Sequence, residues 1–415
     1  MQLEGGPGGI SDYENSAHGK PPGAFSRQSP LAAIPGAGAP LGPGKPVMDN
    51  KTMRFVHDRL PQRVCFGSGQ AAEYLKAEVG RLGASRVMVI ASDRDTALVG
   101  ALSRELPVAL RHDEVVMHVP AEVAERARAA AAARADAVVS IGGGSATGLA
   151  KAVAMTSGLP VIAVPTTYAG SEATPVWGLT KGSAKRTGTD PRVLPKVIVY
   201  DAALTLSLPA DLSVASGLNA LAHCVDSMWA PKADPISTAL AAEGIRALAS
   251  GLPKVAADPA DLAGREEALY AAYLSATALA SAGPALHHKI CHVLGGKYGL
   301  PHAQTHAVVL PYVLAFNAGQ APGAAKRIAA SFGSSGFSGV GALDGLNRLR
   351  AALGAPRALA DYGFTPGDVP GAAAAILPAV PPGNPRPVTL GDLEALLGAA
   401  CSGADPATLS AASGG

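Results

Sequence analysis

Short apolar segments that alternate with alanine-rich stretches constrain the fold of this chain more than any other feature. Segments rich in Val and Ile are expected to form strands at residues 85–93, 113–119, 136–141, 159–167 and 196–201. Helices are expected at 121–135 and 146–157, where alanine predominates. Because the strands are apolar throughout, helices must cover both faces of their sheet, which is typical of a parallel sheet in an α/β domain.

The second half of the chain has a different pattern. Beyond Pro209 the strand-like segments fade, and long helical stretches follow that are interrupted by Pro and Gly. We therefore predict an α/β domain at 53–205 and an all-helical domain at 206–402. The cleft between two such domains is the expected place for a ligand.

Neither end of the chain shows the periodic spacing of apolar residues that is typical of a helix or a strand. Residues 1–52 are rich in Gly and Pro and are expected to be a disordered extension, without the apolar core of a secretory signal. Regular patterning begins at Met53, which is a candidate for the natural start of the protein. Residues 403–415 are expected to be a disordered tail.

Composition excludes several classes of protein. Of the 415 residues 16% are charged, and the net charge of +2 indicates no broad basic surface for nucleic acid. No uninterrupted apolar run approaches the ~18 residues that cross a bilayer, so no membrane partner is expected. The four cysteines are far apart and form no CxxC pair, unlike a disulfide scaffold. These features predict a cytoplasmic enzyme of two domains.

A triple glycine joins an expected strand to an expected helix. Gly142, Gly143 and Gly144 are followed by Ser145, and this small-residue turn lets backbone N–H groups approach a ligand closely. The following helix begins with unpaired N–H groups and a partial positive charge, which suit a diphosphate. The order G-G-G-S-A-T-G differs from both the dinucleotide fingerprint and the P-loop. A tight turn without a ligand is the alternative for this motif alone.

Polar side chains follow other expected strands. Asp93 comes after the first strand, where an acid accepts a ribose hydroxyl, and Arg94 beside it would suit a 2′-phosphate instead. Thr166, Thr167 and Ser171 follow the fourth strand. Ligands of open α/β sheets bind at the carboxyl ends of the strands, so these groups support a nucleotide site.

Histidines gather in the second half. His287, His288, His292, His302 and His306 lie within twenty residues, and His223 precedes them on another expected helix. Burying so many imidazoles in an apolar domain is costly unless they serve a site. They could bind zinc or iron, act as general acids, or stabilise developing negative charge. Spacing alone does not choose among these roles.

Four motifs resemble those of the iron-containing alcohol dehydrogenase superfamily. They are GGGSATGLAKA, VPTTYAGSEATPVWG, SGLNALAHCVDS and LHHKICHVLGGKYGLPHAQTHAVVLP. The resemblance covers residues 53 to 402 and is strongest to the maleylacetate reductase branch. It implies an N-terminal nucleotide-binding domain and a C-terminal all-α catalytic domain, in the architecture of dehydroquinate synthase. It also implies a homodimer.

The resemblance places the family's metal-ligand positions on this chain, where an asparagine stands in place of the aspartate ligand. The metal-dependent members use an aspartate and three histidines, which fall on Asn219, His223, His288 and His302, with His292 nearby. A neutral amide is a poorer ligand for a divalent ion than a carboxylate. Asn at this position, together with Ala146 in place of an aspartate, is similar to the maleylacetate reductases, which are regarded as metal-free. We therefore expect no catalytic metal.

The resemblance also implies the cofactor, which is NADH or NADPH. Its binding residues would be Gly67, Ser68, Asp93, Gly142, Gly143, Gly144, Ser145, Thr166, Thr167 and Lys185. Asp93 favours NADH, whereas Arg94 leaves NADPH open.

The implied reaction reduces the carbon–carbon double bond of maleylacetate to 3-oxoadipate, in the degradation of aromatic compounds. His223, His288 and His302 would stabilise the enolate, and Asn219 would donate its amide to the substrate. Lys289 is the candidate cation for this small dicarboxylate. The alternatives are a metal-dependent dehydrogenase of small alcohols or aldehydes and a nucleotide-binding protein without turnover.

Overall fold

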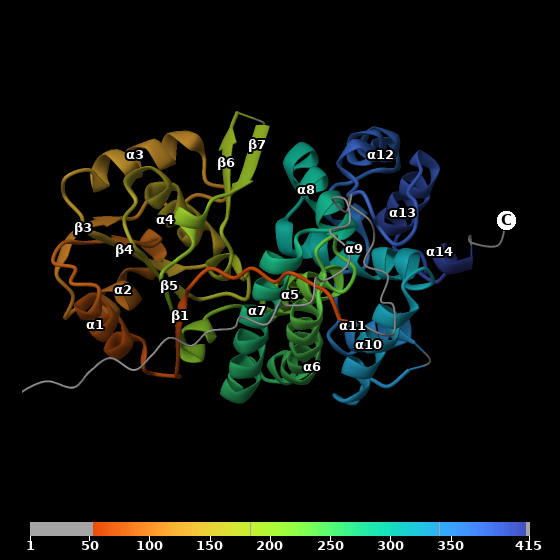
Figure 1. Ribbon diagram of the computed structural model, residues 1–415, viewed down its shortest axis with the longest axis horizontal. Helices are drawn as coiled ribbons and strands as arrows, with labels where there is room; N and C mark the ends of the chain where they lie inside the picture. Colours follow the sequence, from red (N-terminus) through yellow and green to blue (C-terminus); the bar gives the residue numbers. More distant parts are fainter. Residues whose placement is uncertain (1–52, 183, 340, 412–415) are drawn as a thin grey trace, which may run out of the picture. The chain divides into compact units, whose positions relative to one another are not determined.

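A six-stranded parallel sheet forms the centre of the N-terminal half (Figure 1). This computed structural model describes residues 53–182, 184–339 and 341–411. In order across the sheet, the strands are β1 (Arg63–Phe66), β8 (Val197–Tyr200), β5 (Val161–Pro165), β4 (Ala137–Gly142), β2 (Val87–Ile90) and β3 (Val108–His112). Every neighbouring pair is parallel. The expected parallel sheet is confirmed, whereas the extension predicted at 1–52 lies outside the described residues.

Helices cover both faces of the sheet, as the apolar strands predicted. Val87 and Val89 of β2 pack in one cluster with residues of α1 (Ala71–Arg81) and α2 (Thr96–Ser103). Met88 and Ile90, which point to the other face, pack with residues of α3 (Ala121–Ala131) and α4 (Gly144–Ser157). Successive side chains of a strand face opposite ways, so each strand contributes to two cores.

One predicted strand is wrong, and four of the observed strands, β3 among them, were not predicted. Residues 113–119 form no strand, because His118 and Val119 have positive φ angles of 64° and 47° and break an extended run. The strand at this place is β3, which ends before the segment begins. The strand β1 and the antiparallel hairpin of β6 (Val176–Lys181) and β7 (Ala184–Thr189) were not predicted. Their short, partly polar segments carry no strong apolar signal.

The C-terminal half is all-helical, as expected. Its helices are α5 (Ala210–Ser227), α6 (Pro235–Ala257), α7 (Leu262–Ala282), α8 (Leu286–Tyr298), α9 (His302–Ala318), α10 (Pro322–Gly333), α11 (Ala342–Ala352), α12 (Val369–Ile376), α13 (Leu390–Ser402) and α14 (Thr408–Ala411). Within the tail expected to be disordered at 403–415, residues Thr408–Ala411 instead form α14, because Leu409 is buried in a hydrophobic cluster with α9 and α13. Residues 412–415 lie outside the described residues. Among the described helices, none has the length and apolarity to cross a membrane.

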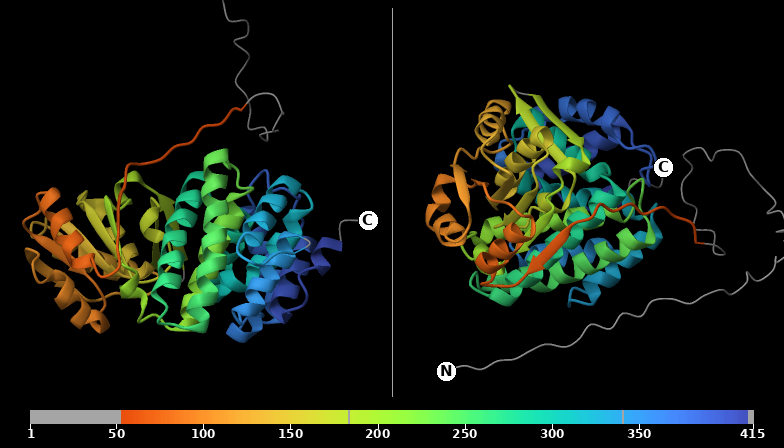
Figure 2. Two further views of the ribbon diagram at one scale, coloured as in Figure 1. Left: turned by 90° about the horizontal axis from the view of Figure 1, so that it is seen from below. Right: turned by 60° about the vertical axis from the view of Figure 1, so that its left-hand side comes forward.

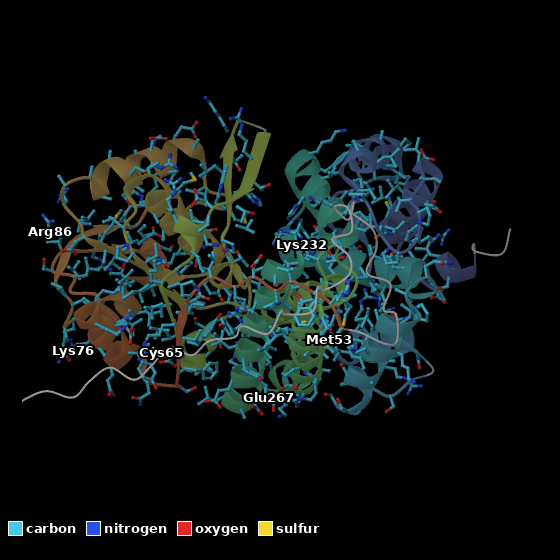
Figure 3. The ribbon with its side chains drawn as sticks, viewed as in Figure 1. Met53, Cys65, Lys76, Arg86, Lys232 and Glu267 are labelled. Carbon is cyan, nitrogen blue, oxygen red and sulfur yellow. The ribbon has the colours of Figure 1, made fainter. Side chains whose placement is uncertain are left out.

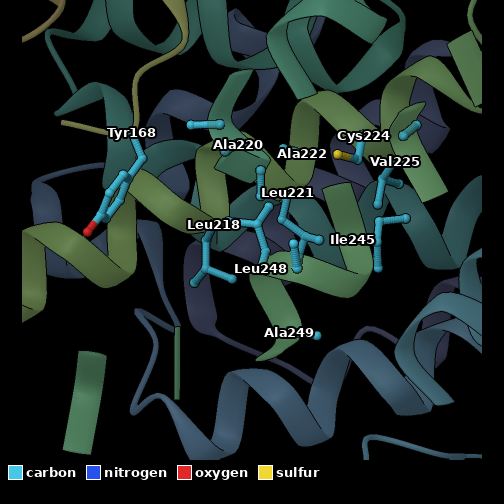
Figure 4. Packing of buried hydrophobic residues seen from close by; sticks show 14 of the residues in the cluster. Tyr168, Leu218, Ala220, Leu221, Ala222, Cys224, Val225, Ile245, Leu248 and Ala249 are labelled. Carbon is cyan, nitrogen blue, oxygen red and sulfur yellow. The ribbon is translucent and has the colours of Figure 1, made fainter. Parts of the chain in front are cut away.

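The helix α5 is the centre of the C-terminal half and is buried along almost its whole length. Leu218, Leu221 and Val225 pack against Ile245 and Leu248 of α6 (Figure 4). Tyr168, from the loop after β5, belongs to the same cluster. Its backbone N–H donates to Ser216 Oγ at 3.1 Å, and the Arg265 guanidinium donates to its hydroxyl at 3.3 Å. The loop after β5 therefore fixes the sheet to the helical half.

Candidate active site

The glycine turn lies between β4 and α4 and has the features of a phosphate cradle. Gly142 has a φ of 141°, a conformation that L side chains rarely adopt. Gly143 is the N-cap of α4 and offers no side chain to the first N–H groups of the helix. A Cβ atom at Gly143 would lie 3.0 Å from Thr167 Cγ2, so the turn packs tightly against the next loop. The donor-rich turn and its close packing fit the diphosphate of a nicotinamide nucleotide.

The strand order places this turn at a topological switch point. The chain leaves β2 toward β3 on one side and leaves β4 toward β5 on the other. Asp93 begins a short helix just beyond β2, so it flanks the switch point opposite the glycine turn. Dinucleotides bind at such points in doubly wound sheets. Asp93 and Arg94 are both exposed, so each is free to meet a ribose or its phosphate.

Two of the predicted nucleotide contacts follow a more distant strand of the same sheet. Gly67 and Ser68 follow β1, which is separated from β4 by β8 and β5. Ser68 Oγ donates to Glu266 Oε1 at 2.6 Å and thereby joins this turn to α7. The side chain of Lys185, on β7, lies outside what the structure describes. These three residues therefore remain predictions as cofactor contacts.

The loop of residues 166–171 connects the nucleotide turn to the histidines. Thr166 N–H donates to the Gly142 carbonyl at 3.1 Å. At the other end of the loop, a Cβ on Gly170 would lie 3.6 Å from His223 Cε1. One loop thus bonds to the glycine turn at one end and lies near the His223 imidazole at the other. That the histidines face the nucleotide turn remains a prediction.

A buried lysine, which the sequence did not single out, holds the segment that follows this loop. Lys151 of α4 donates from Nζ to the Thr174 and Val176 carbonyls, each at 2.8 Å, and to Ser171 O. Burial lowers the pKa of Lys151 to about 7, and the carboxylate of Glu172 opposes that shift. The lysine therefore fixes the backbone between β5 and the β6–β7 hairpin.

Gly170→Ala is expected to destabilise the protein by about 3 kcal/mol in urea unfolding. The new Cβ would lie 2.6 Å from Ala276 Cβ at a φ of 74°, so overpacking adds to backbone strain. Gly158→Ala is the matched control, because Gly158 has a φ of 71° but no atom within 4 Å of the new Cβ. That control is expected to cost about 1 kcal/mol. An equal loss of unfolding free energy in both variants would show that the loop of residues 166–171 can move away from α7 and is not packed tightly against it.

Three helices bring the histidines together. A left-handed Gly299 and Pro301 separate α8 from α9, and α9 folds back so that its histidines contact those of α8. The His223 and His288 rings stack with centroids 5.0 Å apart, and the His306 ring is 5.0 Å from that of His288. The exposed His302 contacts His306, with centroids 4.4 Å apart. The structure thus brings His223 and His288 into direct contact and joins His302 to them through His306.

Asp226 orients His288, a role that was missed in the sequence. Its Oδ2 accepts from His288 Nδ1 at 2.7 Å and from Ala285 N–H at 2.8 Å. Burial opposes ionisation, but the hydrogen bond and charge of His288 hold the pKa of Asp226 below its usual value. With Nδ1–H directed to the carboxylate, Nε2 is the nitrogen of His288 that faces a reactant. The signal was helical spacing, because Asp226 follows Asn219 by seven residues and shares its face of α5.

Six polar atoms in this cluster are buried and have no hydrogen-bond partner among the described residues. They are Asn219 Oδ1, His223 Nδ1, Asp226 Oδ1, His287 Nδ1, His288 Nε2 and His306 Nε2. Leaving such an atom unsatisfied costs about 1–3 kcal/mol, so groups of them are typical of ligand sites. Burial, together with neighbouring imidazoles, lowers the pKa of His223 and His306 well below the usual value. Both rings are therefore neutral at neutral pH.

Lys289 is half-buried on α8 beside His288, about 100° further round the helix. Its backbone N–H donates to the Ala285 carbonyl in the first turn of the helix. Its role as the cation for the substrate remains a prediction.

The ligand positions of the family do not fit a catalytic iron in this chain. Asn219 offers a neutral amide, and His302 lies at the surface while His223 and His288 are buried. Among the described histidines, cysteines and acids, the group whose ligand atoms converge within 4.8 Å is His287, Cys291 and His306. None of these three occupies a ligand position of the family.

Comparison with known proteins agrees with the fold and the site. Residues 61–202 match the iron-containing alcohol dehydrogenase family, and residues 213–401 match the C-terminal part of the Fe-containing alcohol dehydrogenase family. The chain belongs to the iron-containing alcohol dehydrogenase family, as its motifs predicted.

Several relatives within this family are maleylacetate reductases. The maleylacetate reductase of Sphingobium indicum is 46% identical over 362 residues, which are 86% of this chain and 100% of that protein. The crystal structure of maleylacetate reductase from Rhizobium sp. strain MTP-10005 has a TM-score of 0.79 and 43% identity, over 86% of this chain and 100% of that one. A structure described as an iron-containing alcohol dehydrogenase, from Corynebacterium glutamicum, has a TM-score of 0.84 and 58% identity, over 86% and 99% of the two chains.

Proposed function

We propose that this chain is an NAD(P)H-dependent oxidoreductase that reduces the carbon–carbon double bond of maleylacetate to 3-oxoadipate. The observation that carries the proposal is the set of buried, unsatisfied polar atoms on Asn219, His223, His288 and His306, beside a loop that contacts a nucleotide turn. The relatives named maleylacetate reductases support the same substrate. Such a step belongs to the degradation of aromatic compounds.

The chemistry of the substrate defines what the side chains must do. The double bond is conjugated to a ketone, so hydride adds at the β carbon and negative charge develops on the ketone oxygen. A proton must then reach the α carbon. NADH or NADPH supplies the hydride when it is bound. The protein must therefore hold the nucleotide and stabilise an enolate.

The glycine turn and the first N–H groups of α4 would hold the diphosphate, with Thr166 and Thr167 beside it. Asp93 would accept a ribose hydroxyl of NADH, and Arg94 would meet the 2′-phosphate of NADPH. The exposure of both side chains at the same strand end supports a site open to either cofactor, and kcat/KM for each decides the preference.

Neutral imidazoles stabilise the enolate by donating hydrogen bonds. His223 and His306 carry no charge at neutral pH, so each has one N–H to donate and one lone pair. Preorganised donors in a water-poor site are worth more than the same donors in water. His288, fixed by Asp226, would deliver or position the proton through Nε2. His302, at the exposed edge, would contact the entering substrate.

The test is turnover by purified protein with maleylacetate and each cofactor, monitored by loss of nicotinamide absorbance. Reduction of maleylacetate with no oxidation of small alcohols is the expected result. Oxidation of alcohols that depends on added iron or zinc would identify a metal-dependent dehydrogenase instead. Nucleotide binding without any hydride transfer would identify a binding protein.

We also propose a homodimer, formed through residues 53–62. This segment is extended and runs from the helical half toward the sheet (Figures 2 and 3). Met53, Phe55 and Val56 are exposed by 77%, 43% and 80%, although His57 ties the segment down through Asp234 at 3.0 Å. Exposed apolar side chains in a row favour a partner surface.

Light scattering during gel filtration is expected to give twice the chain mass. The double variant Phe55→Ser and Val56→Ser is expected to shift the protein toward the monomer, since it removes apolar side chains from that surface. A wild-type mass of one chain would contradict the dimer.

The predicted cytoplasmic location is kept as part of the proposal. All four cysteines are free and buried, which suits a reducing compartment.

A further inference from the structure

A second group of ligating side chains shares His306 with the proposed catalytic histidines. His287 and Cys291 are four residues apart on α8 and share one face of that helix. His306 reaches them from α9. All three side chains are buried, and their ligand atoms lie within 4.8 Å of one another. The reduction described above uses neither His287 nor Cys291.

We propose that His287, Cys291 and His306 bind a borderline-soft divalent cation such as Zn²⁺, at a site distinct from the iron ligand positions of the family. Two nitrogens and one sulfur are the donor types that zinc prefers. Three protein ligands leave a fourth position for water.

Two of the three distances within the trio are close to those of a tetrahedral site. His287 Nε2 lies 2.9 Å from His306 Nδ1 and 3.6 Å from Cys291 Sγ, and the third pair of ligand atoms lies within 4.8 Å. Bond lengths of about 2.0 Å to nitrogen and 2.3 Å to sulfur give edges of about 3.3 Å and about 3.5 Å in a tetrahedron. A small separation of the two rings is therefore sufficient to admit the ion.

The metal-free arrangement leaves the trio incompletely satisfied. His287 Nε2 faces both a thiol and a ring nitrogen, but a neutral imidazole nitrogen has either one hydrogen to donate or one lone pair. His287 Nε2 therefore makes one good hydrogen bond, either to His306 Nδ1 or to Cys291 Sγ, and interacts only weakly with the other atom. A cation accepts lone pairs from all three atoms at once.

The position of the rings also suits a metal. The ring of His306 contacts the exposed His302, so the trio lies one ring beneath the surface. Metal binding would release the thiol proton of Cys291.

Cobalt(II) is the probe for the test, because thiolate ligation gives it a charge-transfer band in the near ultraviolet. Chelator-treated full-length protein is titrated with Co²⁺, and Zn²⁺ is then added in competition. We expect about one Co²⁺ per chain, with the charge-transfer band and strong visible bands of a tetrahedral site, all lost on addition of Zn²⁺. Absence of these bands from the wild-type protein would overturn the proposal.

Variants distinguish this trio from other thiols. Cys291→Ser is expected to lose the charge-transfer band, and His287→Ala is expected to weaken Co²⁺ binding at least tenfold. Cys401→Ser is the matched control, because Cys401 is also buried but lies on α13, where its Sγ donates to the Phe364 carbonyl, and it is expected to keep the band. Circular dichroism checks that each variant is folded. Two results would contradict the site. One is a charge-transfer band that persists in Cys291→Ser, and the other is an unchanged affinity for Co²⁺ in His287→Ala.

Discussion

Replacing His288 with alanine is expected to lower kcat for maleylacetate about a hundredfold, which corresponds to ~3 kcal/mol of transition-state stabilisation. Nε2 of His288 is buried and unsatisfied, and its ring stacks on His223, so it lies where charge develops in the proposed reaction. Affinity for NADH or NADPH is expected to stay the same, because the glycine turn contacts the loop of residues 166–171 and not His288.

Steady-state kinetics and a nucleotide fluorescence titration measure the two quantities separately. His112→Ala is the control, since His112 ends the edge strand β3 far from the histidine helices, and its kcat is expected to match that of the wild type. Equal losses of turnover and nucleotide affinity in His288→Ala would instead give His288 a structural role.

Asp226→Asn is expected to reduce kcat by roughly a hundredfold, with a smaller change in KM. The carboxylate fixes His288 through Nδ1 at 2.7 Å and neutralises that ring when it carries a proton. The asparagine amide keeps the shape but loses the charge, so the pH profile of kcat is expected to move toward lower pH. Asp226→Glu is expected to restore part of the rate. Asp226 is a positioning residue, because it acts through His288.

Asp234→Asn is a matched control for this substitution. Asp234 pairs with His57 at 3.0 Å in the same His–Asp geometry, but the pair ties down the N-terminal segment and lies outside the site. Its kcat and pH profile are expected to be unchanged. If Asp226→Asn lowers kcat only in proportion to lost folded protein, and the pH profile does not move, then Asp226 supports the fold and not the chemistry.

Local signals in the sequence were sufficient for the nucleotide half. The apolar strands β4 and β5 and the glycines between β4 and α4 are continuous in sequence, so pattern and turn chemistry predict them together. The strand predicted at 113–119 is wrong. The β-branched residues of this segment favour a strand, but the positive φ angles of His118 and Val119 cannot be predicted from residue type. The burial of Leu409 could not be predicted either, because it depends on packing against α9, which is distant in sequence.

The histidine site was predictable only in part. His223 and His288 were predicted from the family motif, and the structure places their rings in contact. Asp226 was missed as a site residue, and His306 was named in the histidine cluster without a role of its own, because both depend on packing between α5, α8 and α9. Lys151 was missed because nothing in an alanine-rich helix shows that its lysine is fully buried. Tertiary contacts, and not local patterns, define these roles.

The most direct measurement of the central claim is maleylacetate reduction after exhaustive chelation, made on the wild-type protein and on Cys291→Ser. If imidazole and amide groups alone stabilise the enolate, both proteins keep their full rate, and added iron or zinc does not raise it. Loss of the rate on chelation in both proteins, with recovery on adding iron or zinc, would contradict the metal-free account. Recovery by zinc that is confined to the wild type would trace the effect to the Cys291 site and not to the catalytic histidines.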